Sequence, residues 1–254
     1  MTEQFETVLL DKADGLGTIR LNRPKALNAI NDQMLADLNA ALDDLEADEA
    51  IRVIAITGEG RAFSAGRDLK EISTEVHRSA GDVWARLTTI GKPVVAVVNG
   101  LCYTGALSML LACDLVIAAD TAVFADTHAK FGMLHGGGTT QRLRDLVGPR
   151  RAKELLFTCE PIDAAEAWRI GLVNRVVPAE QLEDTARNLA ASIIKNNAVA
   201  MASSKYLINA GLQWGTSVGL ELETREYKRQ RREKADELRA DTDSFFTGGK
   251  RDGA

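Results

Sequence analysis

The stretch VVAVVNGLCYTGAL, residues 94–107, decides how this chain of 254 residues folds. It begins as a run of valines, which is typical of a buried strand, and ends in small residues ahead of a helical pattern. An earlier stretch, RVIAITGEGRAFSAGRDL at residues 52–69, has the same order of apolar strand, glycine turn and small residues. We therefore expect two similar strand-to-loop junctions in one fold.

Working outward, short runs rich in β-branched residues recur and most are separated by helical patterns. The predicted strands are GTIRLN (17–22), RVIAITG (52–58), PVVAVVNG (93–100), DLVIAAD (114–120) and VNRVVP (173–178). Residues 31–48 predict an amphipathic helix, whose apolar face is Met34, Leu35, Leu38, Leu42 and Leu45. This alternation predicts an α/β layer fold. Beyond about Leu182 the pattern is helical, and we place a domain boundary near residue 195, giving domains 1–195 and 196–254.

Charge and composition exclude several classes of protein. The formal net charge of −5 lacks the basic excess that non-specific nucleic-acid binding requires. The longest apolar region, 93–119, is interrupted by Asn99, Gly105 and Asp114, so it predicts strands and a helix rather than a membrane span. The first residues show no signal or transit peptide, and we expect a soluble, cytoplasmic protein without membrane association.

Neither metal nor nucleotide motifs are found in the sequence. Three cysteines, Cys102, Cys113 and Cys159, form no CxxC pair and predict neither a zinc site nor a redox pair. No strand is followed by GxGxxG, and the glycine spacing from Gly100 to Gly105 lacks the lysine of a P-loop. We expect no bound cofactor and no metal.

The two glycine-flanked junctions predict a site for a carbonyl oxygen. Small residues, Ala65-Gly66 in one loop and Gly105-Ala106 in the other, surround points where a helix is expected to begin. A helix N-terminus has unpaired N–H groups, and glycine lets a ligand approach the backbone. Two such ends facing one oxygen form an oxyanion hole for a developing enolate. The alternative is that these glycines simply end the strands.

The sequence resembles the crotonase superfamily, the enoyl-CoA hydratase/isomerase family, over nearly its whole length. The similar segments are RPKALNAI (23–30), AFSAGRDL (62–69), VVAVVNGLCYTGAL (94–107), ACDLVIAADTAVF (112–124), GGGTTQRL (136–143) and GLVNRVVP (171–178). The resemblance implies a crotonase-like spiral of ββα units and a C-terminal helical region used in trimerisation, often in hexamers. It also implies an acyl-CoA thioester as substrate, with coenzyme A as part of it, in fatty acid or related acyl-CoA metabolism.

The same resemblance implies roles for particular residues. The oxyanion donors fall on the backbone N–H groups of Arg67 and Gly105. Contacts to coenzyme A fall on Lys25, Ala26, Leu27, Ala65, Gly66 and Asp68, and near the C-terminus on Phe245, Phe246, Lys250 and Arg251. An anionic ligand on an acidic protein needs local cations, which Arg23, Lys25, Arg67, Lys250 and Arg251 would provide.

The resemblance fails at the two positions where family hydratases carry catalytic glutamates. Here these positions are Ser108 and His128. A serine hydroxyl is at most a positioning group, or a small residue that bonds its own backbone. His128 can move a proton near neutral pH, with Asp126 either orienting its ring or capping a short helix. His135 is a further, less favoured acid/base candidate.

Several functions remain open from the sequence. We favour an acyl-CoA enzyme of the hydratase/isomerase type, a lyase or isomerase in which Arg67 and Gly105 stabilise a thioester enolate and His128 moves the proton. Alternatives are an acyl-CoA-binding protein without catalysis and a C–C bond hydrolase or lyase of the same superfamily. A serine hydrolase is disfavoured because AFSAG (62–66), with Ser64, is one glycine short of GxSxG.

Overall fold

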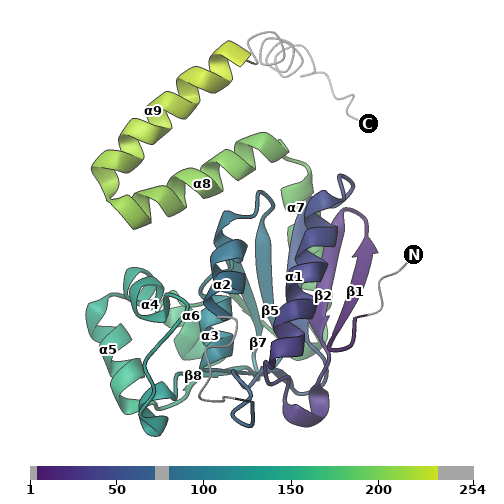
Figure 1. Ribbon diagram of the computed structural model, residues 1–254, viewed down its shortest axis with the longest axis vertical. Helices are drawn as coiled ribbons and strands as arrows, with labels where there is room; N and C mark the ends of the chain where they lie inside the picture. Colours follow the sequence, from purple (N-terminus) through teal and green to yellow (C-terminus); the bar gives the residue numbers. More distant parts are fainter. Residues whose placement is uncertain (1–4, 72–79, 234–254) are drawn as a thin grey trace, which may run out of the picture. The chain divides into compact units, whose positions relative to one another are not determined.

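The computed structural model describes residues 5–71 and 80–233 (Figure 1). These residues form two compact units that divide after Lys205. The first unit holds two sheets and the helices around them, and the second holds the end of helix α8 (Ala198–Trp214) and helix α9 (Thr216–Glu233). The predicted boundary near residue 195, between a core with the acyl-CoA site and an oligomerisation region, stays a prediction. No helix in the described part of the chain is long and apolar enough to cross a bilayer.

The larger sheet has six strands in the order β1-β2-β3-β5-β7-β10. Strands β1 and β2 pair antiparallel, and every other neighbouring pair is parallel. The bounds are β1 (Val8–Ala13), β2 (Leu16–Leu21), β3 (Val53–Gly58), β5 (Val94–Val98), β7 (Leu115–Ala119) and β10 (Arg175–Val177). All five predicted strands are therefore confirmed, each to within a few residues.

The smaller sheet has four short strands in the order β4-β6-β8-β9. These are β4 (Ala62–Ser64), β6 (Leu101–Tyr103), β8 (Val123–Ala125) and β9 (Ile162–Asp163). The first three run parallel, and β9 pairs antiparallel with β8. Strands β3, β5 and β7 of the larger sheet are each followed by a strand of the smaller sheet, which produces the expected spiral of ββα units.

The remaining described elements connect or cover these sheets. They are η1 (Pro24–Ala26), α1 (Asp32–Ala47), α2 (Ala80–Thr89), α3 (Gly105–Leu110), η2 (His128–Phe131), α4 (Thr139–Val147), α5 (Pro149–Thr158), α6 (Ala164–Arg169), η3 (Ala179–Gln181) and α7 (Leu182–Ile194). Helix α1 matches its predicted bounds closely. Its side-chain cap is Asn31, whose Oδ1 accepts a hydrogen bond from the amide of Met34 at 3.0 Å.

The chain passes between the sheets at two glycines, Gly58 and Gly100. A Cβ on Gly58 would lie 2.1 Å from the carbonyl oxygen of Ala62, and one on Gly100 would lie 2.2 Å from that of Arg61. The side chain of Asn99 joins the two turns, accepting from the amide of Gly58 and donating to the carbonyl of Gly60. No other residue type fits at these two crossings, so the glycines fix where each short strand begins.

Burial on both faces of the larger sheet explains its continuous apolar runs. One face packs against α1 and α2 (Figure 1), where the predicted apolar face of α1 is at most 2% exposed. The opposite face packs against α7. The side chains of β3 and β5 divide between these two layers, with Ile54 and Ile56 on the first and Val53 and Ala55 on the second. A strand buried on both faces reads as an unbroken apolar run rather than an alternating one.

One helix start predicted from the sequence is wrong. No helix begins at Ala65-Gly66 within the described residues up to 71. Instead the chain there lies beside Ile30, whose amide donates to the carbonyl of Gly66 at 2.8 Å and whose carbonyl accepts from the amide of Asp68 at 3.0 Å. This bridge holds Arg67 in an extended conformation directly after Gly66, whose φ is +91°, and backbone in these conformations cannot start a helical ladder. The other predicted start, at Gly105, is confirmed by α3.

A partly exposed ion pair ties α8 to the starts of two strands. Lys205 Nζ lies 2.8 Å from Asp114 Oδ2 and also donates to the carbonyls of Leu87 and Lys92. Asp114 Oδ2 in turn accepts from the amide of Val94 at 2.7 Å, which joins the starts of β5 and β7. Burial raises the pKa of Asp114 above its usual value, although the lysine opposes this. Lys205 therefore stabilises the ionised form of Asp114.

We expect Lys205→Met to lower the free energy of unfolding by about 2 kcal/mol, because the carbonyls of Leu87 and Lys92 lose a charged donor and Asp114 loses its counter-charge. Urea denaturation followed by circular dichroism measures this. The matched control is Lys153→Met on an exposed face of α5, which should stay within about 0.5 kcal/mol of the parent protein. Equal stability of the Lys205 variant and the parent would contradict the assignment.

Candidate active site

The loops that follow β4 and β6 are in direct contact. A Cβ on Gly66 would lie 2.8 Å from the carbonyl oxygen of Tyr103 and 2.9 Å from the amide nitrogen of Gly105. A Cβ on Gly105 would in turn lie 3.2 Å from the amide nitrogen of Arg67. Gly66 also has φ +91°, a conformation that other residues rarely adopt. The two glycines therefore let the amides of residues 67 and 105 approach one another.

Both of these amides lack a hydrogen-bond acceptor within the described residues. Gly105 is the first residue of α3, so its N–H lies outside the helical ladder. The bridge to Ile30 uses the carbonyl of Gly66 and the amide of Asp68. The amide of Arg67, which lies between them in the sequence, donates no hydrogen bond to Ile30. Two unpaired donors on neighbouring loops can bind one carbonyl oxygen, because such donors find their partner in a ligand.

Thr104 holds the second loop in an unusual conformation. Its φ of 55° and ψ of −108° lie outside the regions that a β-branched residue normally occupies. The amide of Thr104 donates to the carbonyl of Ala125 at 2.8 Å, and its Oγ1 lies 2.7 Å from Thr127 Oγ1. These bonds to the loop after β8 keep Thr104 in place. They also link the loop that carries Gly105 to the loop that carries His128.

The side chain of Arg67 adds a cation beside the amides. Its Nη2 lies 2.8 Å from Asp32 Oδ1, and its Cγ would be 3.5 Å from a Cβ on Gly105. Nη1 of the same guanidinium is buried and has no partner among the described residues. A buried donor without an acceptor is costly, so this nitrogen is available to an acceptor from a ligand.

Two histidines share one buried carboxylate at the end of β8. His128 Nδ1 lies 3.0 Å from both carboxylate oxygens of Asp126, and His135 Nε2 lies 3.1 Å from Oδ1. The two rings are 4.9 Å apart between centroids and tilted by 55°. Asp126 Oδ1 also accepts from the amide of His128 at 3.1 Å, but the N-cap residue of η2 is Thr127, and its side chain makes no capping bond. Of the two roles predicted as alternatives for Asp126, the contacts favour orientation of the ring.

Glycines place His135 near this carboxylate. It precedes three glycines, and a Cβ on the last but one, Gly137, would lie 2.3 Å from Cδ1 of the buried Trp84. The backbone of this loop is therefore pressed against α2. Spacing in the sequence gave no signal of the contact between His135 and Asp126, because nine residues and a short helix separate them.

The electrostatics of the cluster fix which nitrogens carry protons. Burial raises the pKa of Asp126, but hydrogen bonds from the ring and amide of His128, with the nearby His135, bring it below its usual value overall. An ionised carboxylate only accepts hydrogen bonds, so we assign the protons to His128 Nδ1 and His135 Nε2. His128 Nε2 is then left with a free lone pair, which is the arrangement of a general base.

Ser108 is tied to the protein rather than open to a ligand. Its Oγ lies 2.6 Å from Thr139 Oγ1 and 3.3 Å from the carbonyl oxygen of Thr104, and the residue is 3% exposed. Thr139 Oγ1 donates to the carbonyl of Gly136 at 2.9 Å. These contacts join α3 to the loop that carries His135. They favour the structural interpretation of Ser108 and reveal Thr139, which sequence analysis missed.

The segment predicted to contact coenzyme A lies beside the loop after β4. The amide of Ala65 donates to the carbonyl of Leu27 at 2.9 Å, and Arg23 Nη1 lies 2.9 Å from Asp68 Oδ2. Burial raises the pKa of Asp68, but Arg23 and the amide of Lys70 lower it overall, so this carboxylate is neutralised locally. Lys25 and Ala26 are exposed on η1. Phe245, Phe246, Lys250 and Arg251 lie outside the described residues.

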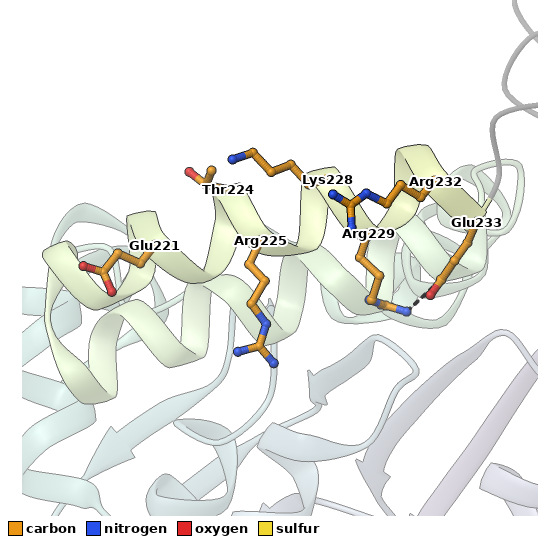
Figure 2. A pocket seen from close by; sticks show the side chains of 7 residues that line it. All are labelled: Glu221, Thr224, Arg225, Lys228, Arg229, Arg232 and Glu233. Atoms are coloured by element: carbon orange, nitrogen blue, oxygen red, sulfur yellow. Dashed lines mark hydrogen bonds and ion pairs between the residues drawn. The ribbon is translucent and has the colours of Figure 1, made fainter.

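Two other features do not qualify as the active site. Ser64 is fully buried and its Oγ accepts from the amide of Gly66 at 3.1 Å, which leaves no access for a nucleophile. A hollow of about 680 Å³ is lined by seven residues of α9 between Glu221 and Glu233, with Arg229 and Glu233 paired at 3.0 Å (Figure 2). Its lining is charged and comes from a single helix, so it is a surface of α9 rather than a binding cleft.

Comparison with known proteins identifies relatives that match most of this chain. The sequence profile described as enoyl-CoA hydratase/isomerase matches residues 11–245. A probable enoyl-CoA hydratase of Mycobacterium bovis is 38% identical over 226 residues, covering 87% of this chain and 88% of the relative. The short-chain-enoyl-CoA hydratase of Clostridium acetobutylicum is 38% identical over 229 residues, with the same coverage of both chains.

A solved structure shows the same fold. The crystal structure of an enoyl-CoA hydratase subunit from Geobacillus kaustophilus has a TM-score of 0.89 and 32% identity, covering 96% of each chain. The profile, the relatives and the solved structure all span most of this chain. The chain therefore belongs to the enoyl-CoA hydratase/isomerase family.

Proposed function

We propose that this enzyme adds water reversibly to short-chain α,β-unsaturated acyl-CoA thioesters. The observation that carries the proposal is the pair of unpaired amides, Arg67 and Gly105, on loops that touch at Gly66. Bound to the thioester oxygen, these donors stabilise the negative charge that forms there when the enolate develops. Preorganised donors of this kind contribute about 3 kcal/mol each to the transition state.

In this proposal His128 moves the proton in both directions. Its Nε2 takes a proton from water while the hydroxide oxygen bonds to the β-carbon, and the electrons of the double bond move to the thioester oxygen as the enolate. The imidazolium then returns its proton to the α-carbon as the enolate collapses to the thioester. Asp126 stabilises the imidazolium, because the carboxylate is buried and lies 3.0 Å from Nδ1.

Lys25, Ala26, Leu27, Ala65, Gly66 and Asp68 would contact coenzyme A. Support comes from the bond that joins Leu27 to Ala65 and from the exposed cation of Lys25 at the edge of this surface. Phe246 and Lys250 are proposed to close the site from the C-terminal segment.

We further propose that copies of the chain associate as a trimer or hexamer through the C-terminal helical region. The support is a series of apolar side chains on α8 and α9 that are more than half exposed: Ile208, Leu212, Trp214, Leu220 and Tyr227. Apolar exposure of this extent usually marks an interface.

A second function is an acyl-CoA-binding protein without catalysis. It is favoured by Ser108 and His128, which stand where family hydratases are expected to carry catalytic glutamates. The deciding experiment follows crotonyl-CoA hydration by the loss of enoyl-thioester absorbance. In parallel, α-proton exchange of a saturated acyl-CoA is measured in deuterated water. Hydration supports the proposed reaction. Exchange without hydration would keep the enolate step and reject water addition, and binding with neither reaction would establish the second function.

We expect His128→Asn to lower kcat by about 10²-fold or more, because the variant has no group to carry the proton. Affinity for a saturated acyl-CoA should change little, since the oxyanion donors are kept. Steady-state kinetics and calorimetric binding measure the two effects. A variant with the parent's kcat would show that His128 is not the base.

Asp126→Asn separates the two contacts of this residue. An amide oxygen can still accept from the backbone amide of His128, but a neutral group no longer stabilises an imidazolium. We expect the thermal midpoint to fall by only a few degrees, because the backbone bond is kept, while kcat falls by about 10²-fold or more. Loss of stability with kcat retained would instead assign Asp126 a structural role alone.

Gly105→Val should abolish turnover and weaken acyl-CoA binding together, because its Cβ would lie 3.2 Å from the amide nitrogen of Arg67 and obstruct the oxygen site. Gly91→Val is the comparison: Gly91 is exposed, and the atom nearest to a Cβ there is the Cβ of Ala202 at 4.0 Å. Both variants are first compared for native circular dichroism. If Gly105→Val retained full acyl-CoA affinity, the amide pair would not be the binding site.

A further inference from the structure

The Asp126, His128 and His135 cluster has the donor set of a transition-metal site as well as that of a proton-transfer group. One carboxylate oxygen and two imidazole nitrogens from these residues all lie within 4.8 Å of one another. Asp126 is 1% exposed, so its charge is kept out of water. We propose that this cluster binds a divalent transition-metal ion such as Zn²⁺, and that the ion inhibits the enzyme by occupying the nitrogens that face Asp126.

The distances fit such an ion after rotation of the two rings. Zinc binds imidazole nitrogen and carboxylate oxygen at about 2.0–2.2 Å, which puts tetrahedral ligand atoms about 3.4 Å apart. The carboxylate already lies 3.0 Å from His128 Nδ1 and 3.1 Å from His135 Nε2. The two ring nitrogens lie within 4.8 Å of one another, so a tetrahedral ion between the three atoms requires them to approach by up to about 1.4 Å, which rotation of the two rings can supply.

The donor types and their accessibility fit as well. Two histidines with one carboxylate suit zinc and other first-row divalent ions, and leave coordination positions open. The side chains of His128 and His135 keep 13% and 18% of their surface exposed, while that of Asp126 is fully covered. An ion can thus enter from the side of the rings, where water completes its coordination.

Binding would change the tautomer of each ring without consuming or releasing a proton. In the metal-free cluster the Nδ1 proton of His128 faces Asp126, and Nε2 has the lone pair. When Nδ1 coordinates the ion, its proton moves to Nε2, and the same exchange occurs in His135 from Nε2 to Nδ1. His128 Nε2 then has no lone pair and cannot take a proton from water. This inhibitory effect rests on the proposed function, whereas the binding itself does not.

Binding is tested by titrating Zn²⁺ into tag-free, chelator-treated protein in a calorimeter, with Co²⁺ absorption as a spectroscopic check on nitrogen coordination. We expect a single ion per chain and a loss of affinity of about tenfold or more in His135→Asn. The chain has three histidines, and His77→Asn, outside the described residues, is the matched control that should bind like the parent. Absence of binding, or equal affinity in His135→Asn, would overturn the proposal.

Inhibition is tested separately, with each protein compared with its own metal-free rate. Added Zn²⁺ should suppress crotonyl-CoA hydration by the parent and by His77→Asn, and a chelator should restore it. Residual activity of His135→Asn should require about tenfold more Zn²⁺ for the same fractional loss. Binding without inhibition would refute the regulatory half of the proposal. If the parent shows no hydration, the proposed function fails, while calorimetry still decides whether the metal site exists.

Discussion

The pairing of β4 with β6 is the constraint on which the site depends. Ala62 lies opposite Leu101 and Ser64 opposite Cys102 in this short parallel ladder. Parallel strands end at the same edge of a sheet, so the loops that leave them emerge side by side. Gly66 and Gly105 then remove the side chains that would hold those loops apart. The two unpaired amides are a consequence of this pairing.

The third strand of the same ladder brings the ionisable groups to that edge. Strand β8 pairs with β6, and Ala125 lies opposite Tyr103. Asp126 follows directly, and the contact between Thr104 and Thr127 links the amide loop to the histidine loop. Each of the three parallel strands thus contributes a different part of the site. In the proposed function, the first two would supply donors for an oxygen, and the third would supply a base with its carboxylate.

Much of this arrangement could be predicted from the sequence. Strands in the larger sheet are visible because burial on both faces leaves continuous apolar runs such as VVAVV at residues 94–98. The helix at 32–47 is visible because its apolar face repeats with helical period and Asn31 caps it. Asp126 beside His128 was expected because two residues of spacing bring the groups within reach.

Other parts could not be predicted because they depend on contacts between distant segments. Small residues at 65 and 66 suggested a helix start, but the bridge to Ile30 holds Arg67 in an extended conformation. The approach of His135 to Asp126 requires the glycine loop to pack on Trp84, which is a property of the tertiary structure. Likewise Thr139, the partner of Ser108, lies 31 residues away. Local patterns carry no information about such pairs.

The division of labour among β4, β6 and β8 has an evolutionary consequence. Main-chain donors survive almost any side-chain replacement, whereas the loop after β8 can exchange its ionisable residues without disturbing them. A lineage with this fold can therefore retain the two amides while the ionisable residues of the other loop change one substitution at a time. In this chain the groups that have come together at that edge are one carboxylate and two imidazoles.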